Sequence, residues 1–201
     1  MPRGVAIPEL HERLFDAAER LLVREGPAAL STRAITTEAG CAKGVLHNHF
    51  TDLDGFLTEF VLACFQTALH GVAELPTRAG HATVVDNLSE AADTLFGSPI
   101  RAAHAIVAFR PAVAARLRHD REHHAPTLVD LERVFSAYLE AEKEHGRISA
   151  TIDTSAVAFA LVATVHHLLM TGRVNDMDPR GTFSRVIDTL LGADVPANPP
   201  A

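Results

Sequence analysis

The chain has 201 residues, of which 47% are hydrophobic and 21% are charged, and its formal net charge is −7. This composition provides enough apolar side chains for a sizeable core and excludes a globally disordered chain. The acidic balance argues against a generally basic nucleic-acid binder, so any DNA binding must depend on where a few cations point.

The first expected helix covers residues 9–24. Pro8 suits its first turn, and Gly26 followed by Pro27 ends it. Apolar side chains recur along it at helical spacing, which predicts one buried face: Leu10, Leu14, Ala17, Ala18, Leu21 and Leu22.

Two short helices joined by a tight turn are expected between residues 32 and 50. Thr32 is the expected N-cap of the first of them. Ile35 and Ala39 are four residues apart and therefore share a face. Gly40 ends this helix, because glycine adopts the left-handed conformation at low cost.

The second short helix is expected over Ala42–Asn48. Leu46 and Phe50 are spaced to face inward, whereas Lys43 and His47 face outward. A short helix with an apolar back and a front of lysine, histidine and asparagine fits the major groove of B-DNA. The candidate DNA-binding residues are Thr32, Arg33, Ala42, Lys43, Gly44, Val45, His47, Asn48 and His49.

This stretch resembles the tetracycline-repressor (TetR) family of bacterial transcription regulators, whose pattern is roughly T-x-x-x-I-A-x-x-A-G-V-S-x-G-x-L-Y-x-H-F. The resemblance covers about residues 10–60. The chain keeps the following residues in register: Thr32, Ile35, Ala39, Gly40, Gly44, Leu46, His49 and Phe50.

The chain departs from the family pattern at two positions that contact phosphates in the family. His47 stands where a tyrosine is usual, and Leu53 stands where a lysine is common. Imidazoles carry only a partial positive charge near neutral pH. The resemblance therefore implies a weaker and more pH-sensitive non-specific affinity for DNA than a lysine-rich relative would have.

Further helices are expected over residues 54–75, 82–96, 100–119, 126–145, 153–171 and 179–191, and no strands are expected. Pro111 must bend or split one of these helices, and residues 116–124 read as a charged connector. The helix over 153–171 is apolar on nearly every face, so its own domain can cover only part of it. The rest suggests a partner subunit, and the resemblance implies that the last two helices pair with a second copy as a four-helix bundle.

These elements predict an all-α fold of nine or ten helices. Residues 1–55 form the expected three-helix helix-turn-helix DNA-binding domain. Residues 56–201 form the expected C-terminal bundle for effector binding and dimerisation. The resemblance implies a ligand-responsive homodimer, most often a repressor, on a near-palindromic operator with half-sites about 34 Å apart.

The effector is expected to be a small lipophilic molecule, because pockets between bundle helices are mostly apolar with a few polar groups. His104 and His166 lie on otherwise apolar stretches and are the expected polar contacts. The candidate effector-binding residues are Phe60, Cys64, His104, Phe109, Phe135, Tyr138, Phe159, His166 and Met170.

Two functions of other classes are kept as alternatives. His119, Glu122 and His123 match the H-x-x-E-H pattern of zinc proteases, although they lie in the charged connector and have no obvious third ligand. The other alternative is a helical interaction protein whose head has lost its DNA affinity, because the first 55 residues hold six basic and eight acidic side chains. We expect no enzyme, no catalytic metal and no cofactor.

The chain reads as a cytoplasmic protein with no membrane segment. Cys41 and Cys64 both lie in apolar helical contexts, as free thiols in a reducing compartment do. The N-terminus lacks the pattern of a signal peptide. The longest apolar run, Ala156–Met170, is short for a membrane span and contains two histidines.

Overall fold

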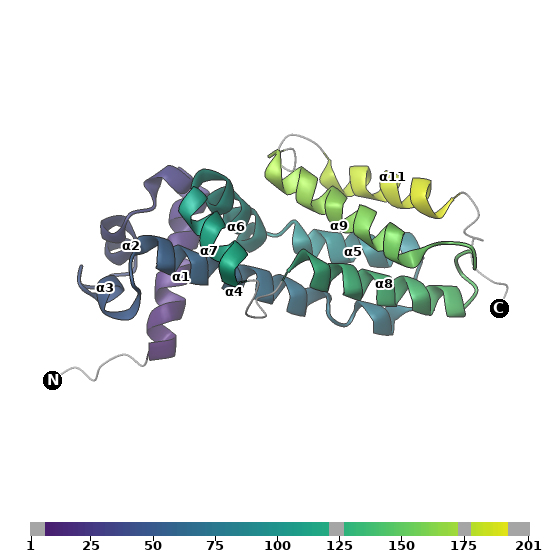
Figure 1. The fold of residues 1–201 in the computed structure, drawn as a ribbon, viewed down its shortest axis with the longest axis horizontal. Helices are drawn as coiled ribbons and strands as arrows, with labels where there is room; N and C mark the ends of the chain where they lie inside the picture. The colour runs from purple at the N-terminus through teal and green to yellow at the C-terminus, as the bar shows by residue number, and fades with distance from the viewer. Residues whose placement is uncertain (1–6, 121–126, 173–177, 193–201) are drawn as a thin grey trace. The chain divides into compact units, whose positions relative to one another are not determined.

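The computed structural model describes residues 7–120, 127–172 and 178–192. Within these ranges the regular elements are ten α-helices and two short 3-10 helices, with no strand, which confirms the predicted all-α class (Figure 1). In chain order they are α1 (Ile7–Glu25), η1 (Pro27–Ala29), α2 (Thr32–Glu38), α3 (Val45–His49), α4 (Leu53–Val72), η2 (Leu75–Arg78), α5 (Val84–Leu95), α6 (Ser98–Phe109), α7 (Pro111–Asp120), α8 (Leu128–Glu144), α9 (Thr154–Met170) and α11 (Pro179–Leu191).

The chain divides into two compact units. The head unit comprises residues 1–64 and 98–125, and the bundle unit comprises residues 65–97 and 126–201. The sequence-based division after residue 55 differs from these units in two ways. The first part of α4, as far as residue 64, belongs to the head unit, and so does the distant segment that contains α6 and α7.

The core of the head unit forms where α1 packs against α2, η1 and α6. Leu14, Ala17 and Ala18 have no exposed surface, as the spacing of apolar residues in α1 predicts. Aromatic rings fill the space beside them. The ring of Phe15 lies 5.5 Å from that of Phe56, and the ring of Phe50 lies 5.0 Å from it.

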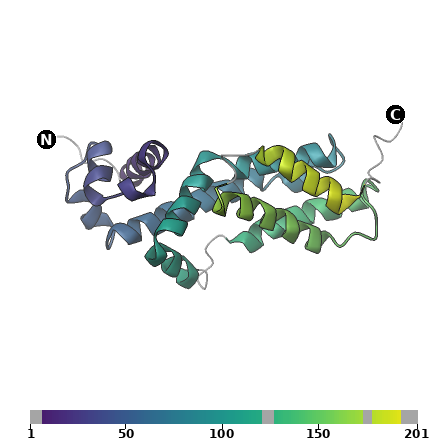
Figure 2. The same ribbon diagram turned by 90° about the horizontal axis from the view of Figure 1, so that it is seen from above.

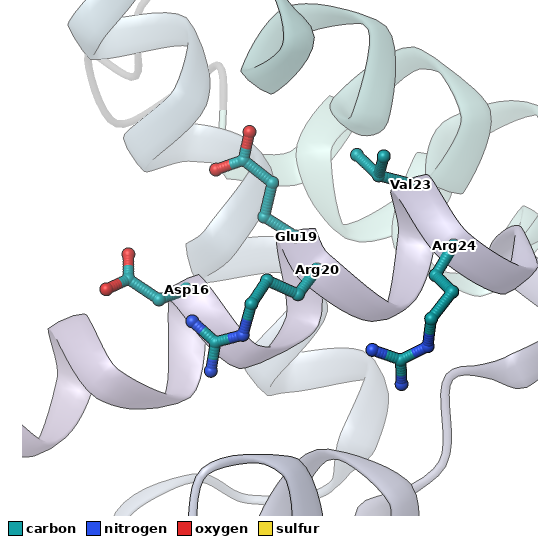
Figure 3. Close-up of a pocket in the computed structure, with 5 residues that line it drawn as sticks. All are labelled: Asp16, Glu19, Arg20, Val23 and Arg24. Carbon is teal, nitrogen blue, oxygen red and sulfur yellow. The ribbon is translucent and has the colours of Figure 1, made fainter.

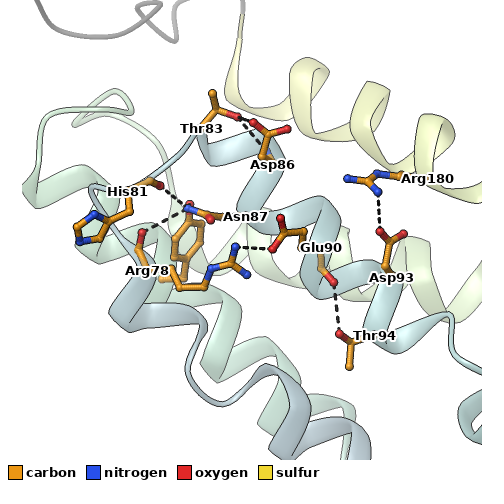
Figure 4. Close-up of polar contacts among 10 residues, drawn as sticks. Arg78, His81, Thr83, Asp86, Asn87, Glu90, Asp93, Thr94 and Arg180 are labelled. Carbon is orange, nitrogen blue, oxygen red and sulfur yellow. Dashed lines mark hydrogen bonds and ion pairs between the residues drawn. The ribbon is translucent and has the colours of Figure 1, made fainter.

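In the bundle unit, α5, α8, α9 and α11 lie alongside one another, as the two views in Figures 1 and 2 show. Polar contacts fasten α11 to α5. Arg180 Nη1 lies 2.8 Å from Asp93 Oδ2 (Figure 4), and the hydroxyls of Ser89 and Ser184 lie 3.1 Å apart. These contacts place α11 over one side of the bundle.

Several boundaries correct the sequence-based expectations. Pro111 splits the expected helix over 100–119 into α6 and α7, as predicted, but α7 continues to Asp120. A charged connector was expected over residues 116–124, but residues 116–120 are helical. α4 ends at Val72 instead of residue 75, because Pro76 lacks a backbone N–H; Pro76 is instead the second residue of η2. α8 begins at Leu128 after an N-cap at Thr127.

One stretch, Leu53–Arg78, is long and apolar enough to cross a membrane by length and composition alone. Several of its apolar side chains are covered by the protein, and 44% of the apolar window is buried. Phe56 and Leu57 have no exposed surface, and Phe60 is 3% exposed. Burial of this kind is typical of a core helix.

Candidate nucleic-acid interface

The helix-turn-helix is built by local capping. Ser31, and not Thr32 as expected, is the N-cap of α2, because its hydroxyl accepts a hydrogen bond from the Ala34 N–H at 3.2 Å. Thr32 is the first helical residue. Gly40 has φ 65° and ends α2 as predicted. The chain then turns with a hydrogen bond of 2.8 Å from Cys41 N–H to the Thr36 carbonyl.

The second helix of the motif is shorter than expected. α3 begins at Val45, and the expected helical residues Ala42–Gly44 form the turn that leads into it. Gly44 is its N-cap, and the Asn48 N–H bonds to the Gly44 carbonyl at 3.1 Å. Leu46 and Phe50 are buried, at 0% and 4% exposed, which confirms that they form the inward face.

Side chains of α1 hold α2 in place. Arg13 Nη2 donates to the Ala39 carbonyl at 2.8 Å, which satisfies the C-terminus of α2. Arg20 and Arg24 both pair with Glu38, at 3.0 and 2.9 Å. These arginines therefore neutralise a carboxylate inside the head unit. The sequence pattern did not reveal these pairs, because the partners are 14 or more residues apart.

The outward side chains of the motif form one continuous strip. Ala42, Lys43, Gly44, His47, Asn48 and His49 are exposed, together with Arg33 on α2, whereas Val45 and Thr32 are partly exposed. Within the described residues, neither Lys43 nor Arg33 makes an ion pair. The two cations are therefore available to an external anion. We call residues 42–49 the reading strip.

A third histidine supports the strip from α1. The ring of His11 lies 4.8 Å from that of Phe50 and packs edge-on against His49 at 6.0 Å. Three imidazoles, from His11, His47 and His49, thus belong to one small region of the head unit.

The charge of the head unit differs from that of the whole chain. Its residues include 11 basic and 11 acidic side chains, so its formal charge is zero. The bundle unit holds 7 basic and 14 acidic side chains and carries the whole net charge of −7. The first 55 residues look acidic only because the arginines supplied by residues 98–125 are far away in the sequence.

The nine candidate effector residues are divided between the two units. Phe60, Cys64, His104 and Phe109 belong to the head unit, and Phe135, Tyr138, Phe159, His166 and Met170 belong to the bundle unit. Most of them are buried or partly buried, but three are exposed: Phe109 at 53%, Phe159 at 61% and Met170 at 40%.

The polar members of this group already have internal contacts. His104 Nδ1 lies 2.9 Å from the Ile100 carbonyl, and the Tyr138 hydroxyl donates to Glu142 at 2.5 Å. Burial, and then the charge of His167, lower the pKa of His166. Burial, with a contribution from the charge of Glu19, raises the pKa of the Cys64 thiol to about 12, so this cysteine stays protonated.

One surface hollow, of about 390 Å³, runs along α1. It is lined by Asp16, Glu19, Arg20, Val23 and Arg24, and Figure 3 shows Arg20 and Arg24 pointing to one side of the helix and Glu19 and Val23 to the other. Its lining comes from a single helix and mixes both signs of charge. The hollow lacks the enclosed apolar walls typical of a lipophilic ligand site.

The expected zinc motif lies largely outside the described residues. His119 is on α7, whereas Glu122 and His123 fall between the described ranges. Among the residues that the structure describes, no group of three His, Cys, Asp or Glu side chains is placed to hold a metal ion. Glu142 is a buried residue bonded to Tyr138 and Arg147.

Comparisons with known proteins agree with this architecture. The family described as bacterial regulatory proteins, tetR family, matches residues 14–60. No curated protein matches the chain. Among solved structures, a protein of Mesorhizobium loti assigned to the TetR family has 18% identity and a TM-score of 0.68, with 94% of this chain and 96% of that chain covered.

Two further solved structures have the same fold. The fatty acid degradation regulator FadR from Bacillus halodurans has 15% identity and a TM-score of 0.65, with 92% of this chain and 96% of that chain covered. SmeT of Stenotrophomonas maltophilia in complex with triclosan has 17% identity and a TM-score of 0.64, with 96% and 98% covered. The chain therefore carries a tetR-family match over its helix-turn-helix and shares, along its length, the fold of solved structures assigned to that family.

Proposed function

We propose that this DNA-binding regulator acts as a cytoplasmic homodimer that represses transcription from a near-palindromic operator and responds to a lipophilic effector. The observation that carries the proposal is the reading strip. It presents Lys43 and two histidines on a capped helix-turn-helix whose unit has no net negative charge. Two copies would present two such strips to half-sites about 34 Å apart.

The residues of the strip suit different tasks at a DNA duplex. Lys43, His47 and His49 can serve phosphates or the acceptors of guanine, and Val45 can pack on a thymine methyl group. Gly44 has open space where a Cβ would be, so it permits a close approach of the backbone. The eight residues of the reading strip thus offer side chains both for contacts to phosphates and for contacts to bases.

Replacing Lys43 tests this proposal. In fluorescence-anisotropy titrations with a duplex selected from a random pool, Lys43→Ala should weaken binding about tenfold or more. The slope of log K against log salt should fall by about 0.9 for each phosphate that the variant no longer neutralises. Arg133→Ala is the matched control, because it removes an exposed cation of the bundle unit. Equal affinity of Lys43→Ala and the wild type would remove Lys43 from the interface.

An exposed apolar face on α9 supports the homodimer. Ala156, Phe159, Ala163 and Met170 are exposed there and recur at helical spacing, whereas the opposite side of α9 is buried in the bundle. Val186 and Leu190 of α11 are partly exposed. An apolar stripe that is exposed to water in one subunit is commonly covered by a second subunit in a stable oligomer. We assign this face to a second copy of the chain, with α9 and α11 of each copy in the interface.

A charge placed on this face should separate the dimer. Phe159→Arg should convert the protein to a monomer in light-scattering measurements after size exclusion, because an arginine would be buried without a partner. Val129→Arg changes an apolar side chain of α8 that is 41% exposed and should leave the dimer intact. If wild-type protein is already monomeric at micromolar concentration, the proposed assembly is wrong.

The effector proposal is supported by the relatives. One neighbour is a complex with triclosan, and another is a regulator of fatty acid degradation. Both point to apolar molecules with a polar end. A ligand at 100 times its Kd should stabilise the protein by about 2.7 kcal/mol and raise its melting temperature. It should also change operator affinity, since typical coupling is about 1–3 kcal/mol. Absence of any hit in a thermal-shift screen of lipophilic acids and phenols would contradict the proposal.

A further inference from the structure

Two arginines of the α6–α7 segment reach the flanks of the helix-turn-helix. Arg110 lies at the break between α6 and α7 that Pro111 imposes. Its Nη2 donates to the Leu30 carbonyl at 2.8 Å, and its Nη1 donates to Asp54 Oδ1 at 2.9 Å. Leu30 immediately precedes the N-cap of α2, and Asp54 is in the first turn of α4. One guanidinium therefore ties together the two ends of the motif.

Arg116 on α7 makes the second connection. Its two terminal nitrogens each bond to one oxygen of Asp52 at 2.7 Å, in the bidentate geometry that gives both strength and orientation. Asp52 stands three residues after the end of α3. Its Oδ1 also accepts the Gly55 N–H at 2.7 Å and so caps α4. The linker between α3 and α4 is therefore fixed from outside the motif.

The first turn of α4 is shaped to admit this arginine. A Cβ at Gly55 would lie 3.1 Å from Arg116 Nη1 and 3.4 Å from Asp52 Oδ1. A larger residue would press on the ion pair. The hydrogen bonds from Arg116, followed by the one from Gly55, lower the pKa of Asp52 to about 2, so the carboxylate stays charged at neutral pH.

We propose that Arg110 and Arg116 are positioning residues for DNA binding: they set the angle at which α3 is presented without touching DNA themselves. This inference rests on the proposed DNA-binding function. The guanidinium groups are occupied by Asp52 and Asp54, the first two acidic residues after the reading strip in the sequence.

The test compares Arg110→Gln, Arg116→Gln and Arg116→Lys with the wild type in salt titrations of duplex binding. Positioning predicts an affinity loss of about tenfold for both glutamine variants. It also predicts an unchanged slope of log K against log salt, since the protein still neutralises the same phosphates. Arg116→Lys keeps the positive charge but cannot form the bidentate pair with Asp52. Its affinity for DNA should therefore lie between those of Arg116→Gln and the wild type. Arg118→Gln removes an exposed cation of the same helix and should bind like the wild type.

Two results would overturn the assignment. A slope that falls by about 0.9 for each arginine replaced, with Arg116→Lys binding as well as the wild type, would mean that these arginines bind phosphates directly. Unchanged affinity in both glutamine variants would mean no role in DNA binding. Circular dichroism at the assay temperature verifies that each variant is folded.

A second measurement needs no DNA. Hydrogen exchange of the amides of residues 45–50 should become faster in Arg116→Gln than in Arg118→Gln, because α3 loses an anchor. Equal exchange in the two variants would reject the positioning role. If the wild type binds no duplex even in dilute salt, the proposed function fails instead, and hydrogen exchange still decides whether these arginines hold α3.

Discussion

Glu142 is a charged side chain with no exposed surface, and three groups of the bundle unit satisfy it. The Tyr138 hydroxyl donates to its carboxylate at 2.5 Å, and the Gly80 N–H and Arg147 Nη1 each approach it at 3.3 Å. Burial, together with the Glu142 carboxylate, raises the pKa of the Tyr138 phenol. Asn87 continues the network by donating to Tyr138 and, as Figure 4 shows, to two loop carbonyls. This network fixes the loop before α5 against the end of α8.

Truncating the central carboxylate should therefore be costly. Glu142→Ala leaves the guanidinium of Arg147 and the hydroxyl of Tyr138 without their acceptor, and should lower the free energy of unfolding by about 3 kcal/mol. Urea titration at fixed protein concentration measures this difference. Glu144→Ala, an exposed change on the same helix, should stay within about 0.5 kcal/mol of the wild type. A loss of similar size in both variants would contradict the role of Glu142.

Asp52 gives the head unit a defined response to acid. Its folded pKa of about 2 lies below the ordinary value of 3.8, because Arg116 and then Gly55 bond to the charged form. The pair therefore stabilises the folded state fully above about pH 4, and this contribution disappears as the pH falls toward 2. Asp52→Asn should be less stable than the wild type at pH 7, and the difference should become much smaller as the pH falls to 2. A difference that persists unchanged to pH 2 would show that the charge of Asp52 is irrelevant.

Among the elements, α4 and α5 are in close contact at Gly71, near the C-terminal end of α4. A Cβ added at Gly71 would lie 2.7 Å from Thr94 Cγ2, which is closer than carbon atoms pack. Alanine normally favours a helix over glycine by about 1 kcal/mol. We expect the contact at Thr94 to reverse that preference. The absence of a side chain at Gly71 thus sets the spacing of two helices of the bundle unit.

The variant Gly71→Ala should consequently destabilise the protein by about 1–3 kcal/mol in urea titration, despite its better helix propensity. Thr94→Ser removes the obstructing methyl group and should restore most of the stability in the double variant. The coupling between the two changes in a double-mutant cycle measures the clash directly. Additive effects would show that the helices separate freely at this point.

Sequence patterns located the long helices well and the short ones poorly. The bounds of α11 match the expectation, because Pro179 and Gly192 mark its ends and Asp178 caps it through the Gly181 N–H. α9 follows an equally clear cap at Asp153. α3 has only five residues, so its start at Val45 depends on the turn geometry at Lys43 and Gly44, which residue periodicity does not encode.

The sequence could predict which side chains of the helix-turn-helix are exposed, but not which residues hold the motif in place. The exposure of Lys43, His47 and His49 follows from the burial of Leu46 and Phe50 on the opposite side of α3. The contribution of Arg110 and Arg116 could not be read from the chain, because each partner carboxylate is 56 or more residues away. Likewise, the exposure of Phe159 and Met170 separates them from the buried candidates only once α9 is packed.

At the scale of the whole molecule, acidic and basic side chains are balanced in one unit and unbalanced in the other. The bundle unit carries the entire formal charge of −7, whereas the head unit is neutral. Affinity for arbitrary DNA comes almost wholly from cations that replace condensed counterions. We therefore expect a regulator with this charge to have little affinity for arbitrary DNA.

This imbalance affects how the protein would search a genome. A bacterial chromosome offers millions of competing sequences, and a strongly cationic regulator spends most of its time bound to them. The negative charge of the bundle unit would disfavour non-specific binding to DNA. A larger fraction of the protein would then be unbound and able to find the operator. Few copies per cell could then keep a promoter occupied, provided that the bases themselves supply the discrimination.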